Sequence, residues 1–326
     1  MKRRLLLFSV LSAFLLLAAC GQERSASLSS PKQSASTDSW PKELHVGFQK
    51  SSFSLFLKEK GYLEKQLQKH GVQVKWFEFQ SGPPLLEALN AGQIDIGYVG
   101  GAPAVLAQAN PGSKLVYIAY EPEVARAIIV PKTSPIRTVA DLKGKRVAFG
   151  KGSSAHYTLL TALETAGLTL DDISQVYLQP AEARTAFERG DVDAWAIWDP
   201  FLADAEVNGG ARVLIDANGL PKQYGLIVGR KEYVKQYRKV ADVVIKELGK
   251  VHQEIQSSPD EAARLLAKET KIGEDIWKKT LSRRGYGVFP LTKEVIDAQQ
   301  RIADRFYELG LIPKTIKVRD AVIAEQ

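Results

Sequence analysis

Short apolar runs alternate with amphipathic segments through the middle of this 326-residue chain, and this alternation strongly constrains its fold. Four apolar runs between residues 44 and 120 have the composition of strands, and residues 146–216 repeat the pattern without obvious sequence identity. Such alternation favours a mostly parallel sheet flanked by helices. The repeat therefore predicts an α/β protein with two similar lobes. The expected strands are 44–49, 74–79, 94–99, 115–120, 146–150, 175–178, 193–198 and 212–216, and the expected helices are 53–69, 84–91, 155–166 and 181–189.

Two extended segments connect the repeats. ARAIIV (125–130) leads out of the first lobe, and YGLIVGR (224–230) leads back into it. A lobe that is entered and left through two such segments has a natural hinge, because few backbone dihedrals absorb the relative motion. Residues 231–326 read as mostly helical and are expected to pack on the first lobe. The predicted lobes are 44–129 plus 228–326, and 130–227.

The N-terminal residues differ from the rest of the chain. Three basic residues at positions 2–4 precede the apolar run LLLFSVLSAFLLLAA, which is shorter than the roughly 20 residues of a membrane-spanning helix. These features predict a signal peptide over residues 1–19. The run LAAC, which ends at Cys20, resembles the lipobox of bacterial lipoproteins, in which this cysteine carries lipid; the alternative is an ordinary signal peptide with an incidental cysteine. Residues 20–43 are rich in serine and predict a flexible tether.

The charge balance excludes a nucleic-acid-binding surface. The formal net charge is +7, and removal of residues 1–19 would take away three positive charges and no negative ones, which leaves +4. This mild excess is spread among many acids, and the chain carries none of the basic motifs of nucleic-acid-binding domains. The single cysteine can form no disulfide within the chain.

Four predicted strands are followed by loops that place glycine, serine or proline at the start of a helix. In open α/β sheets, ligands bind beyond the carboxyl ends of the strands, where such loops lie. The first turn of a helix offers unpaired N–H donors and the positive end of the helix dipole, and both favour an anion. Helix capping alone would explain any single one of these loops. Because loops of this kind recur at equivalent points, after four strands, they predict one shared anion site. The loops are KSS (50–52), QSGPP (80–84), GGAP (100–103) and GKGSS (150–154).

Motifs of the common enzyme sites are missing or incomplete. A Walker A loop needs G-x-x-x-x-G-K-[ST], whereas Gly144 lies six positions before Gly150, and Lys151 is followed by glycine. Ser153 or Ser154, together with His156 and Asp199, supplies the residue types of a hydrolase triad, but G-x-S-x-G is missing. The four histidines are scattered along the chain. No catalytic residue, metal site or cofactor is predicted.

DAWAIWDP (193–200) is the most unusual run of the chain. Trp198 and Asp199 fall at the carboxyl end of a predicted strand, and hence at the expected site. Trp195 faces either the core or solvent. Asp199 precedes Pro200, where it would serve as a helix N-cap, as an acceptor toward a ligand or its loops, or as both.

Several of these segments together resemble the aliphatic-sulfonate-binding proteins of ABC importers. The resemblance covers roughly residues 44–326 and is weakest in the C-terminal helices. It implies a two-lobed periplasmic-binding-protein fold of type II, in which each lobe is a mostly parallel sheet flanked by helices and two hinge segments join the lobes. The segments that carry it are GFQK (47–50), EFQSGPPLLEALNAGQIDIG (78–97), AQ (107–108), VADLKGKRVAFGKGSSAHYTLLTAL (139–163), PAEARTAF (180–187) and DVDAWAIWDP (191–200).

The resemblance implies a carrier without a reaction of its own. Such a protein is an exported, lipid-anchored monomer on the periplasmic or extracytoplasmic side, which binds a small organic anion between its lobes and delivers it to the permease of an ABC importer. The ligand implied is an aliphatic sulfonate. The candidate ligand-binding residues are Gln49, Lys50, Ser81, Gly82, Gly101, Ala102, Ser153, Ser154, Ala155, His156, Trp198 and Asp199.

One departure leaves the substituent of the sulfonate open. Family members often read close to GSTGDIPP where this chain has GYVGGAPA (97–104). Tyr98 and Val99 replace small hydroxyl residues there, so a bulkier and more apolar wall is expected.

Other ligands and another function remain as alternatives. A sulfonate needs only donors, such as serine hydroxyls and helix N–H groups, with Lys50 as a supporting charge. The same fold would carry taurine, nitrate, an aromatic sulfonate or a thiamine-precursor pyrimidine; taurine would need an acid for its ammonium group, such as Glu121, Glu123 or Asp199. The distant alternative is an enzyme related to thiamine-pyrimidine synthesis, which would be expected to keep a reactive cysteine or histidine cluster.

Overall fold

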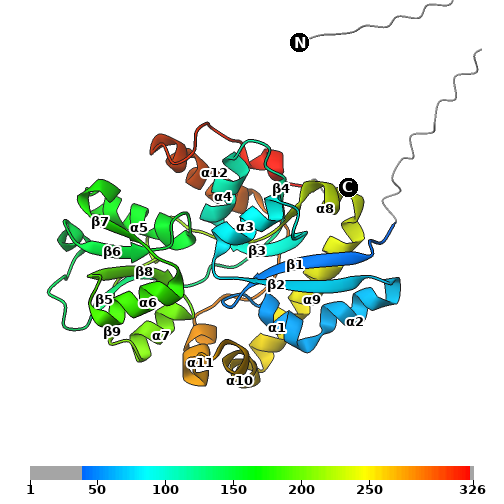
Figure 1. The fold of residues 1–326 in the computed structure, drawn as a ribbon, viewed down its shortest axis with the longest axis horizontal. Coiled ribbons are helices and arrows are strands. Elements are labelled where there is room, and N and C mark those ends of the chain that lie inside the picture. Colours follow the sequence, from blue (N-terminus) through cyan, green and yellow to red (C-terminus); the bar gives the residue numbers. More distant parts are fainter. Residues whose placement is uncertain (1–38, 324–326) are drawn as a thin grey trace, which may run out of the picture. The chain divides into compact units, whose positions relative to one another are not determined.

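Two five-stranded sheets form the centre of the structure, a computed structural model that describes residues 39–323 (Figure 1). These residues fall in one compact unit. In both sheets four strands run the same way, and the fourth strand in the order is antiparallel to its neighbours. The order in the first sheet is β2 (Gln73–Phe79), β1 (Glu43–Gln49), β3 (Ile96–Gly100), β10 (Gly225–Arg230) and β4 (Leu115–Glu121). The order in the second is β7 (Ser174–Tyr177), β6 (Arg146–Phe149), β8 (Ala194–Trp198), β5 (Arg126–Pro131) and β9 (Ala211–Asp216).

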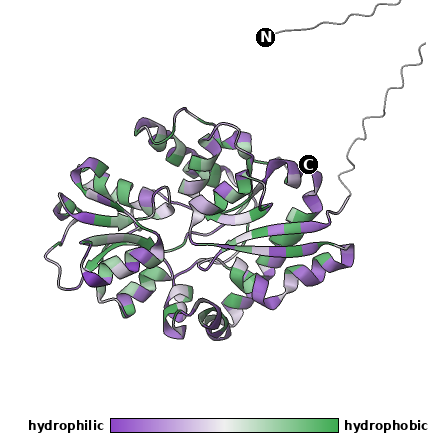
Figure 2. Cartoon of the chain, viewed as in Figure 1, coloured by the Kyte–Doolittle hydropathy of each residue, from purple (hydrophilic) through white to green (hydrophobic). Residues whose placement is uncertain are grey.

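Helices cover both faces of each sheet, so the inner strands are buried and read as near-continuous apolar runs (Figure 2), whereas the edge strands β2, β7 and β9 are partly exposed. The predicted mostly parallel, two-lobed α/β architecture is confirmed. The helices are α1 (Ser54–Lys60), α2 (Tyr62–Leu67), α3 (Gly82–Asn90), α4 (Gly101–Ala109), α5 (Ser154–Thr165), α6 (Pro180–Arg189), α7 (Phe201–Val207), α8 (Lys231–Gln236), α9 (Arg238–Ser257), α10 (Pro259–Thr270), α11 (Glu274–Ser282) and α12 (Lys293–Glu308).

The predicted signal peptide (1–19), the predicted lipidation site Cys20 and the tether up to residue 38 lie outside the described residues. None of the helices between residues 39 and 323 combines the length and the apolar composition needed to cross a bilayer.

The single helix expected over 53–69 is wrong. The structure divides this stretch into α1 and α2 at Gly61, whose φ is 62°. A residue in this left-handed conformation ends a helix, and glycine adopts it without a steric penalty. The amphipathic pattern continues across the break, because both helices bury apolar side chains against the same core.

The two segments expected to join the lobes are strands, and each pairs with the sheet that it leads into. β5 pairs with β8 and β9, so residues 126–129 lie in the second sheet. β10 pairs with β3 and β4, so residues 225–227 lie in the first sheet. Each crossing between the sheets is therefore a few residues earlier than the boundaries expected at 129/130 and 227/228.

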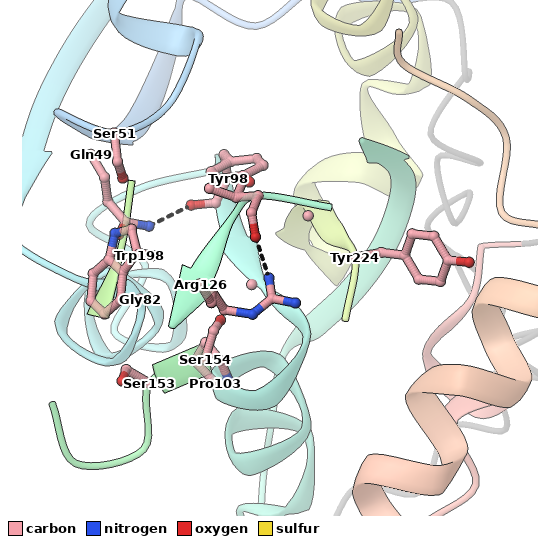
Figure 3. Close-up of a pocket in the computed structure, with 13 residues that line it drawn as sticks. Gln49, Ser51, Gly82, Tyr98, Pro103, Arg126, Ser153, Ser154, Trp198 and Tyr224 are labelled. Carbon is pink, nitrogen blue, oxygen red and sulfur yellow. Dashed lines mark hydrogen bonds between the residues drawn. The ribbon is translucent and has the colours of Figure 1, made fainter. Parts of the chain in front are cut away.

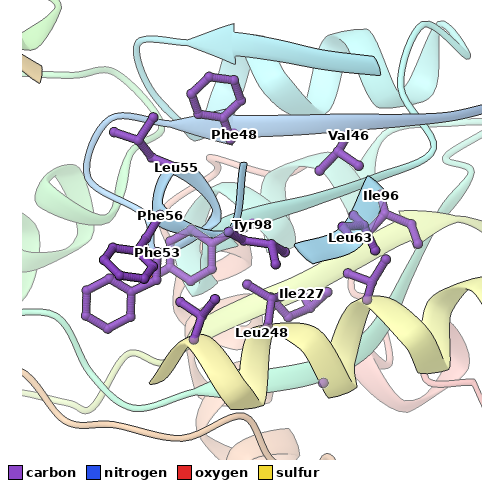
Figure 4. Packing of buried hydrophobic residues seen from close by; sticks show 14 of the residues in the cluster. Val46, Phe48, Phe53, Leu55, Phe56, Leu63, Ile96, Tyr98, Ile227 and Leu248 are labelled. Carbon is purple, nitrogen blue, oxygen red and sulfur yellow. The ribbon is translucent and has the colours of Figure 1, made fainter. Parts of the chain in front are cut away.

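The first sheet has an apolar core on each face, and the second sheet has its own core. One face of the first sheet packs against α1, α2, α9 and α10, and Phe53, Phe56 and Leu248 are among the side chains of this core (Figure 4). The C-terminal helices thus complete the first lobe, with α12 on its other face beside α4. α11 packs on α10 and also meets α7 beside the second sheet.

We expect the substitution Phe306→Ala in α12 to destabilise the protein strongly. The Phe306 side chain is fully buried against α4 and Tyr157, and removal of such a ring costs about 3–5 kcal/mol because it leaves a cavity. Its neighbour Tyr307 is 45% exposed, so Tyr307→Ala should change the free energy of unfolding by less than about 0.5 kcal/mol. Urea denaturation measures both; equal effects would contradict the packing described for α12.

Candidate functional site

A small polar pocket lies where the two sheets and both connecting segments meet; we call it the central pocket (Figure 3). Its volume, measured with a water-sized sphere, is about 40 Å³. This is room for about three groups of the size of a water molecule. The loops after β1, β3, β6 and β8 all reach it, as expected for the carboxyl ends of parallel strands. The residues that line it are Gln49, Ser51, Gly82, Tyr98, Gly100, Pro103, Val124, Arg126, Ser153, Ser154, Trp198, Tyr224 and Gly225.

Arg126 supplies the only positive charge in the wall of the central pocket, as far as residues 39–323 describe it. It is the first residue of β5 and lies opposite Trp198 in the register of the second sheet. Its side chain is 4% exposed. A buried cation has to be paired or hydrogen-bonded to be tolerated.

Two groups of the same connecting segment meet this requirement. The guanidinium of Arg126 donates to the backbone oxygen of Val124 at 2.9 Å and forms an ion pair with Glu123. Burial lowers the pKa of Arg126, and the charge of Glu123 opposes this shift. The buried Nε–H of Arg126 has no hydrogen-bond partner among the described residues. An unpaired donor is therefore left on a guanidinium that lines the pocket.

Neutral groups from the first sheet form the opposite wall. Gln49 donates through Nε2 to the backbone oxygen of Tyr98 at 3.0 Å, which holds the ends of β1 and β3 together (Figure 3). Burial raises the pKa of Tyr98 to about 12, although the nearby Arg284 counteracts it. The phenol of Tyr98 therefore stays protonated at neutral pH and is able to donate a hydrogen bond.

A buried charged cluster supports this wall from behind. Arg284 donates to the backbone oxygen of Ser51 at 2.8 Å and to Glu121 at 3.1 Å. His252 Nε2 lies 3.3 Å from the same carboxylate without hydrogen-bond geometry, and its Nδ1 accepts from the backbone of Gly287. Burial raises the pKa of Glu121, but His252 and Arg284 outweigh burial, and the net shift is downward. The cluster holds Ser51 at the pocket.

The start of α5 contributes serines from the second sheet. Ser153 is the N-cap: its hydroxyl accepts from the backbone N–H of His156 at 3.3 Å and donates to the oxygen of Gly150 at 2.7 Å. Ser154 lies across the pocket from Gly100, where an added Cβ would come within 1.9 Å of the Ser154 hydroxyl. A side chain at position 100 would therefore displace the Ser154 hydroxyl from this place in the pocket.

Comparisons with known proteins agree with this architecture. The family model for phosphonate-type periplasmic substrate-binding proteins of ABC transporters matches residues 58–224. A protein of Escherichia coli (strain K12) described as aliphatic sulfonates-binding is 40% identical over 289 residues, 87% of this chain and 90% of that protein. Its counterpart in Bacillus subtilis (strain 168) is 33% identical, with 86% of each chain covered. The crystal structure of the alkanesulfonate-binding protein SsuA from Xanthomonas axonopodis pv. citri, bound to MOPS, superposes with a TM-score of 0.81 at 40% identity, and covers 87% of this chain and 98% of that one.

The chain belongs to the aliphatic-sulfonate-binding family of ABC-importer substrate-binding proteins. The resemblance found in the sequence is thereby confirmed, together with the type of fold that it implies.

The central pocket brings together five of the twelve candidate residues. They come from four separate loops, and each lies at the carboxyl end of a strand or at the start of a helix. Trp198 is 8% exposed and lines the pocket, whereas Trp195 is buried in the core of the second sheet. The five residues are Gln49, Gly82, Ser153, Ser154 and Trp198.

Asp199 does not line the central pocket, and its carboxylate is bound by an arginine. Arg283 donates to both carboxylate oxygens of Asp199, at 2.7 and 2.5 Å, and also to Glu206 at 2.8 Å. The remaining contact of Asp199 is an N-cap-like hydrogen bond from the backbone of Ala203 at 3.1 Å. The N-cap of α7 is Pro200, so Asp199 lies one residue ahead of the N-cap position while its side chain still accepts from the first turn of the helix. Arg283 occupies the carboxylate that was predicted, as one alternative, to accept from a ligand or its loops.

His156 also lies outside the pocket wall. The ring is 4% exposed and stacks on Phe149 at 4.9 Å between ring centroids. Nδ1 accepts a hydrogen bond from the backbone N–H of Gly152 at 3.2 Å, which fixes the loop ahead of α5. Burial, together with the charge of Lys151, lowers the pKa of His156 to about 4. The histidine of the family motif KGSSAHY is therefore neutral and positions its loop.

The other five candidates surround the pocket without lining it. Lys50 is half exposed and pairs with Glu78 at 3.6 Å. Gly101 receives a hydrogen bond on its backbone oxygen from Gln299 at 2.6 Å, and an added Cβ there would meet the same side chain. The remaining three are buried at the starts of α3, α4 and α5: Ser81, Ala102 and Ala155.

Arg126 is the main residue that sequence reasoning missed. It precedes a run of apolar residues and was expected to belong to a connecting segment. A usable signal existed, because an arginine next to Glu123 at the start of a buried strand has to be paired or bound. Tyr98 was singled out as a bulky wall residue, and it does line the pocket. Its neighbour Val99 points to the opposite face and is buried in the core, as alternation along a strand requires.

The polar groups that converge here are donors rather than reactive groups. Among residues 39–323, no set of three or more histidine, cysteine, aspartate or glutamate side chains is arranged to hold a metal ion. The arrangement is suited to an anion that is bound from two sheets by one guanidinium and several neutral hydrogen-bond donors.

We expect the stability of the protein to depend on the titration of His156. The unfolded chain takes up this proton near pH 6.5, whereas the folded protein does so only near pH 4. Between these values the unfolded state binds more protons, so stability falls as the pH falls, by up to about 3 kcal/mol below pH 4. His156→Asn keeps an acceptor for Gly152 but cannot titrate. Urea unfolding at pH 7, 5.5 and 4 should therefore show a smaller loss for the variant, and parallel losses would contradict the prediction.

Proposed function

We propose that this protein is an extracytoplasmic binding protein that holds an aliphatic sulfonate in the central pocket and delivers it to the permease of an ABC importer. The observation that carries the proposal is the buried Arg126, whose Nε–H lacks a partner in a pocket otherwise lined by neutral donors. The aliphatic-sulfonate-binding relatives support it, and the ligand of one of them, MOPS, is itself a sulfonate.

The size and charge of the central pocket fit the headgroup. Its space of about 40 Å³ takes about three water-sized groups, which is the number of oxygens on a sulfonate. A sulfonate carries one negative charge and no proton, so its headgroup only accepts hydrogen bonds. A guanidinium, serine hydroxyls and a phenol supply donors of the kind that it needs. One oxygen would accept the buried Nε–H of Arg126, which otherwise costs free energy as an unpaired donor.

The carboxylates near the pocket disfavour taurine. Its ammonium group would need a free acid, and three were candidates. Glu121 is bound by Arg284, Glu123 by Arg126 and Asp199 by Arg283. A ligand with an ammonium group would have to displace one of these buried or half-buried pairs, and breaking such a pair costs several kcal/mol.

Binding closes the protein in this proposal. The lobes built on the two sheets supply opposite walls of the pocket, and the segments ahead of β5 and β10 act as the hinge. A ligand that contacts both walls stabilises the closed form by its difference in affinity for the two states. The closed form then docks as a monomer on the permease, and lipid on Cys20 would keep the carrier at the membrane. The protein carries out no reaction of its own.

We expect Arg126→Gln to weaken the binding of a short alkanesulfonate by roughly 10- to 100-fold, because a hydrogen bond to a charged group contributes about 1.5–3 kcal/mol. Lys293→Ala is the control: it removes an 80% exposed cation that lies outside the central pocket, and should change this affinity by less than about threefold. Isothermal titration with propane-1-sulfonate measures both, and thermal unfolding without ligand checks that each variant is folded. Equal losses, or no loss in Arg126→Gln, would contradict the assignment of Arg126.

We expect the headgroup to decide binding. Propane-1-sulfonate should raise the midpoint of thermal unfolding, because a ligand that binds only the folded state stabilises it by mass action. Taurine should raise it less, because its ammonium finds no free carboxylate. Propylphosphonate should also raise it less below neutral pH, because its P–OH proton needs an acceptor. The same shift with all three ligands would show that the donor-only pocket described here does not select the ligand.

A further inference from the structure

Lys271 has a backbone conformation that no other non-glycine residue between 39 and 323 adopts. Its φ is 61°, and the other positive-φ positions in this range are twelve glycines. It follows the last residue of α10, a position where glycine is strongly preferred because a Cβ is strained there. A lysine at this position loses stability that glycine would keep, so its side chain indicates a use.

The side chain lies in the wall of a second cavity, which we call the side cavity. Its space for water-sized spheres is about 290 Å³. It shares Ser51 with the central pocket, so the two lie next to each other. Three parts of the chain form it: the ends of β1 and β2, the starts of α6 and α7, and the turn after α10. The lining residues are Lys50, Ser51, Glu78, Phe79, Gln80, Pro180, Ala181, Arg184, Phe201, Thr270, Lys271 and Ile272.

The side cavity is much larger than the central pocket, so the two cavities suit different parts of a ligand. The central pocket, at about 40 Å³, holds a headgroup and little more. The substituent of a sulfonate therefore has to extend beyond it, and the side cavity adjoins it at Ser51. Another cavity of about 240 Å³ adjoins it at Pro103, but no lysine or arginine of residues 39–323 lines that cavity. Phe79, Phe201 and Ile272 give this cavity the apolar surface that an alkyl chain needs.

Among the three cations that line the side cavity, Lys271 alone has no carboxylate partner between residues 39 and 323. Lys50 pairs with Glu78 at 3.6 Å, and Arg184 pairs with Glu188 at 2.8 Å and with Asp204. Lys271 instead donates to the backbone oxygen of Lys268 at 2.8 Å. An ammonium group has three N–H donors, so two stay available, and no carboxylate in the described part of the chain pairs with it.

From these observations, and on the basis of the proposed function, we infer that the side cavity is a second subsite for an anionic group at the far end of the substituent, with Lys271 as its charged ligand. The substrate class is then an alkanesulfonate that carries a terminal carboxylate or a second sulfonate. A purely structural role is the competing explanation, since lysine near a helix C-terminus also stabilises the last carbonyls. That role would affect stability but not the choice between ligands.

The test compares matched ligands on matched variants. Isothermal titration of the purified protein would use alkane-1-sulfonates and ω-sulfoalkanoates of two to six carbons. The variant is Lys271→Gly, which is expected to fold because glycine favours the backbone conformation found there. The control is Lys268→Ala: it removes the same charge from an 80% exposed side chain in the same helix, outside the cavity, and keeps the backbone oxygen that Lys271 binds.

We expect at least one ω-sulfoalkanoate to bind the wild-type protein about tenfold more tightly than the alkanesulfonate of equal length. Lys271→Gly should abolish this preference, because it should weaken the binding of the ω-sulfoalkanoate about tenfold more than that of the plain alkanesulfonate. Lys268→Ala should keep the preference, and added salt should weaken it. Absence of the preference at every length, or an equal loss for both ligands in Lys271→Gly, would overturn the second subsite while the headgroup site stands. Failure of every sulfonate to bind would overturn the proposed function, and the second subsite with it.

Discussion

The burial of Arg126 is the constraint on which the site depends. A guanidinium that is 4% exposed cannot remain unpaired, and the chain meets this need with Glu123 and the backbone of Val124, both in the segment that crosses between the sheets. The same residue starts β5 and lies opposite Trp198. The charge of the pocket and one of the two segments that cross between the sheets are therefore parts of a single stretch, so a change in the crossing segment changes the position of the charge.

Two consecutive arginines after α11 then connect both lobes to the C-terminal region. Arg283 binds Asp199 and Glu206 beside the second sheet, and Arg284 binds Glu121 and the backbone of Ser51 beside the first. These pairs keep the carboxylates near the pocket occupied, which leaves the central pocket as a site of donors. The helices that complete the first lobe thus also decide the charge that a ligand meets.

Sequence patterns predicted the elements well, because local spacing decides them. Strands and helices lie within about two residues of their expected bounds except where Gly61 divides a helix, and the loops at strand ends did place Gln49, Ser153 and Trp198 in one pocket. Pairing of charges over long separations could not be predicted. Asp199 pairs with Arg283, which lies 84 residues away in the sequence. Only the folded structure shows that this carboxylate already has a partner.

The ion pair between Arg126 and Glu123 also affects how readily a bound ligand is released. A carrier has to bind its ligand firmly enough to close and weakly enough to deliver it, and an uncompensated buried cation would hold an anion very strongly. A carboxylate already paired with the guanidinium lowers the net charge that the ligand meets. In the proposed site the ligand would gain mainly from hydrogen bonds contributed by both lobes, and separation of the lobes would remove those from one side. The affinity for the ligand then depends on closure of the lobes and not on the charge alone. This is what a carrier requires if it is to release its ligand when it opens.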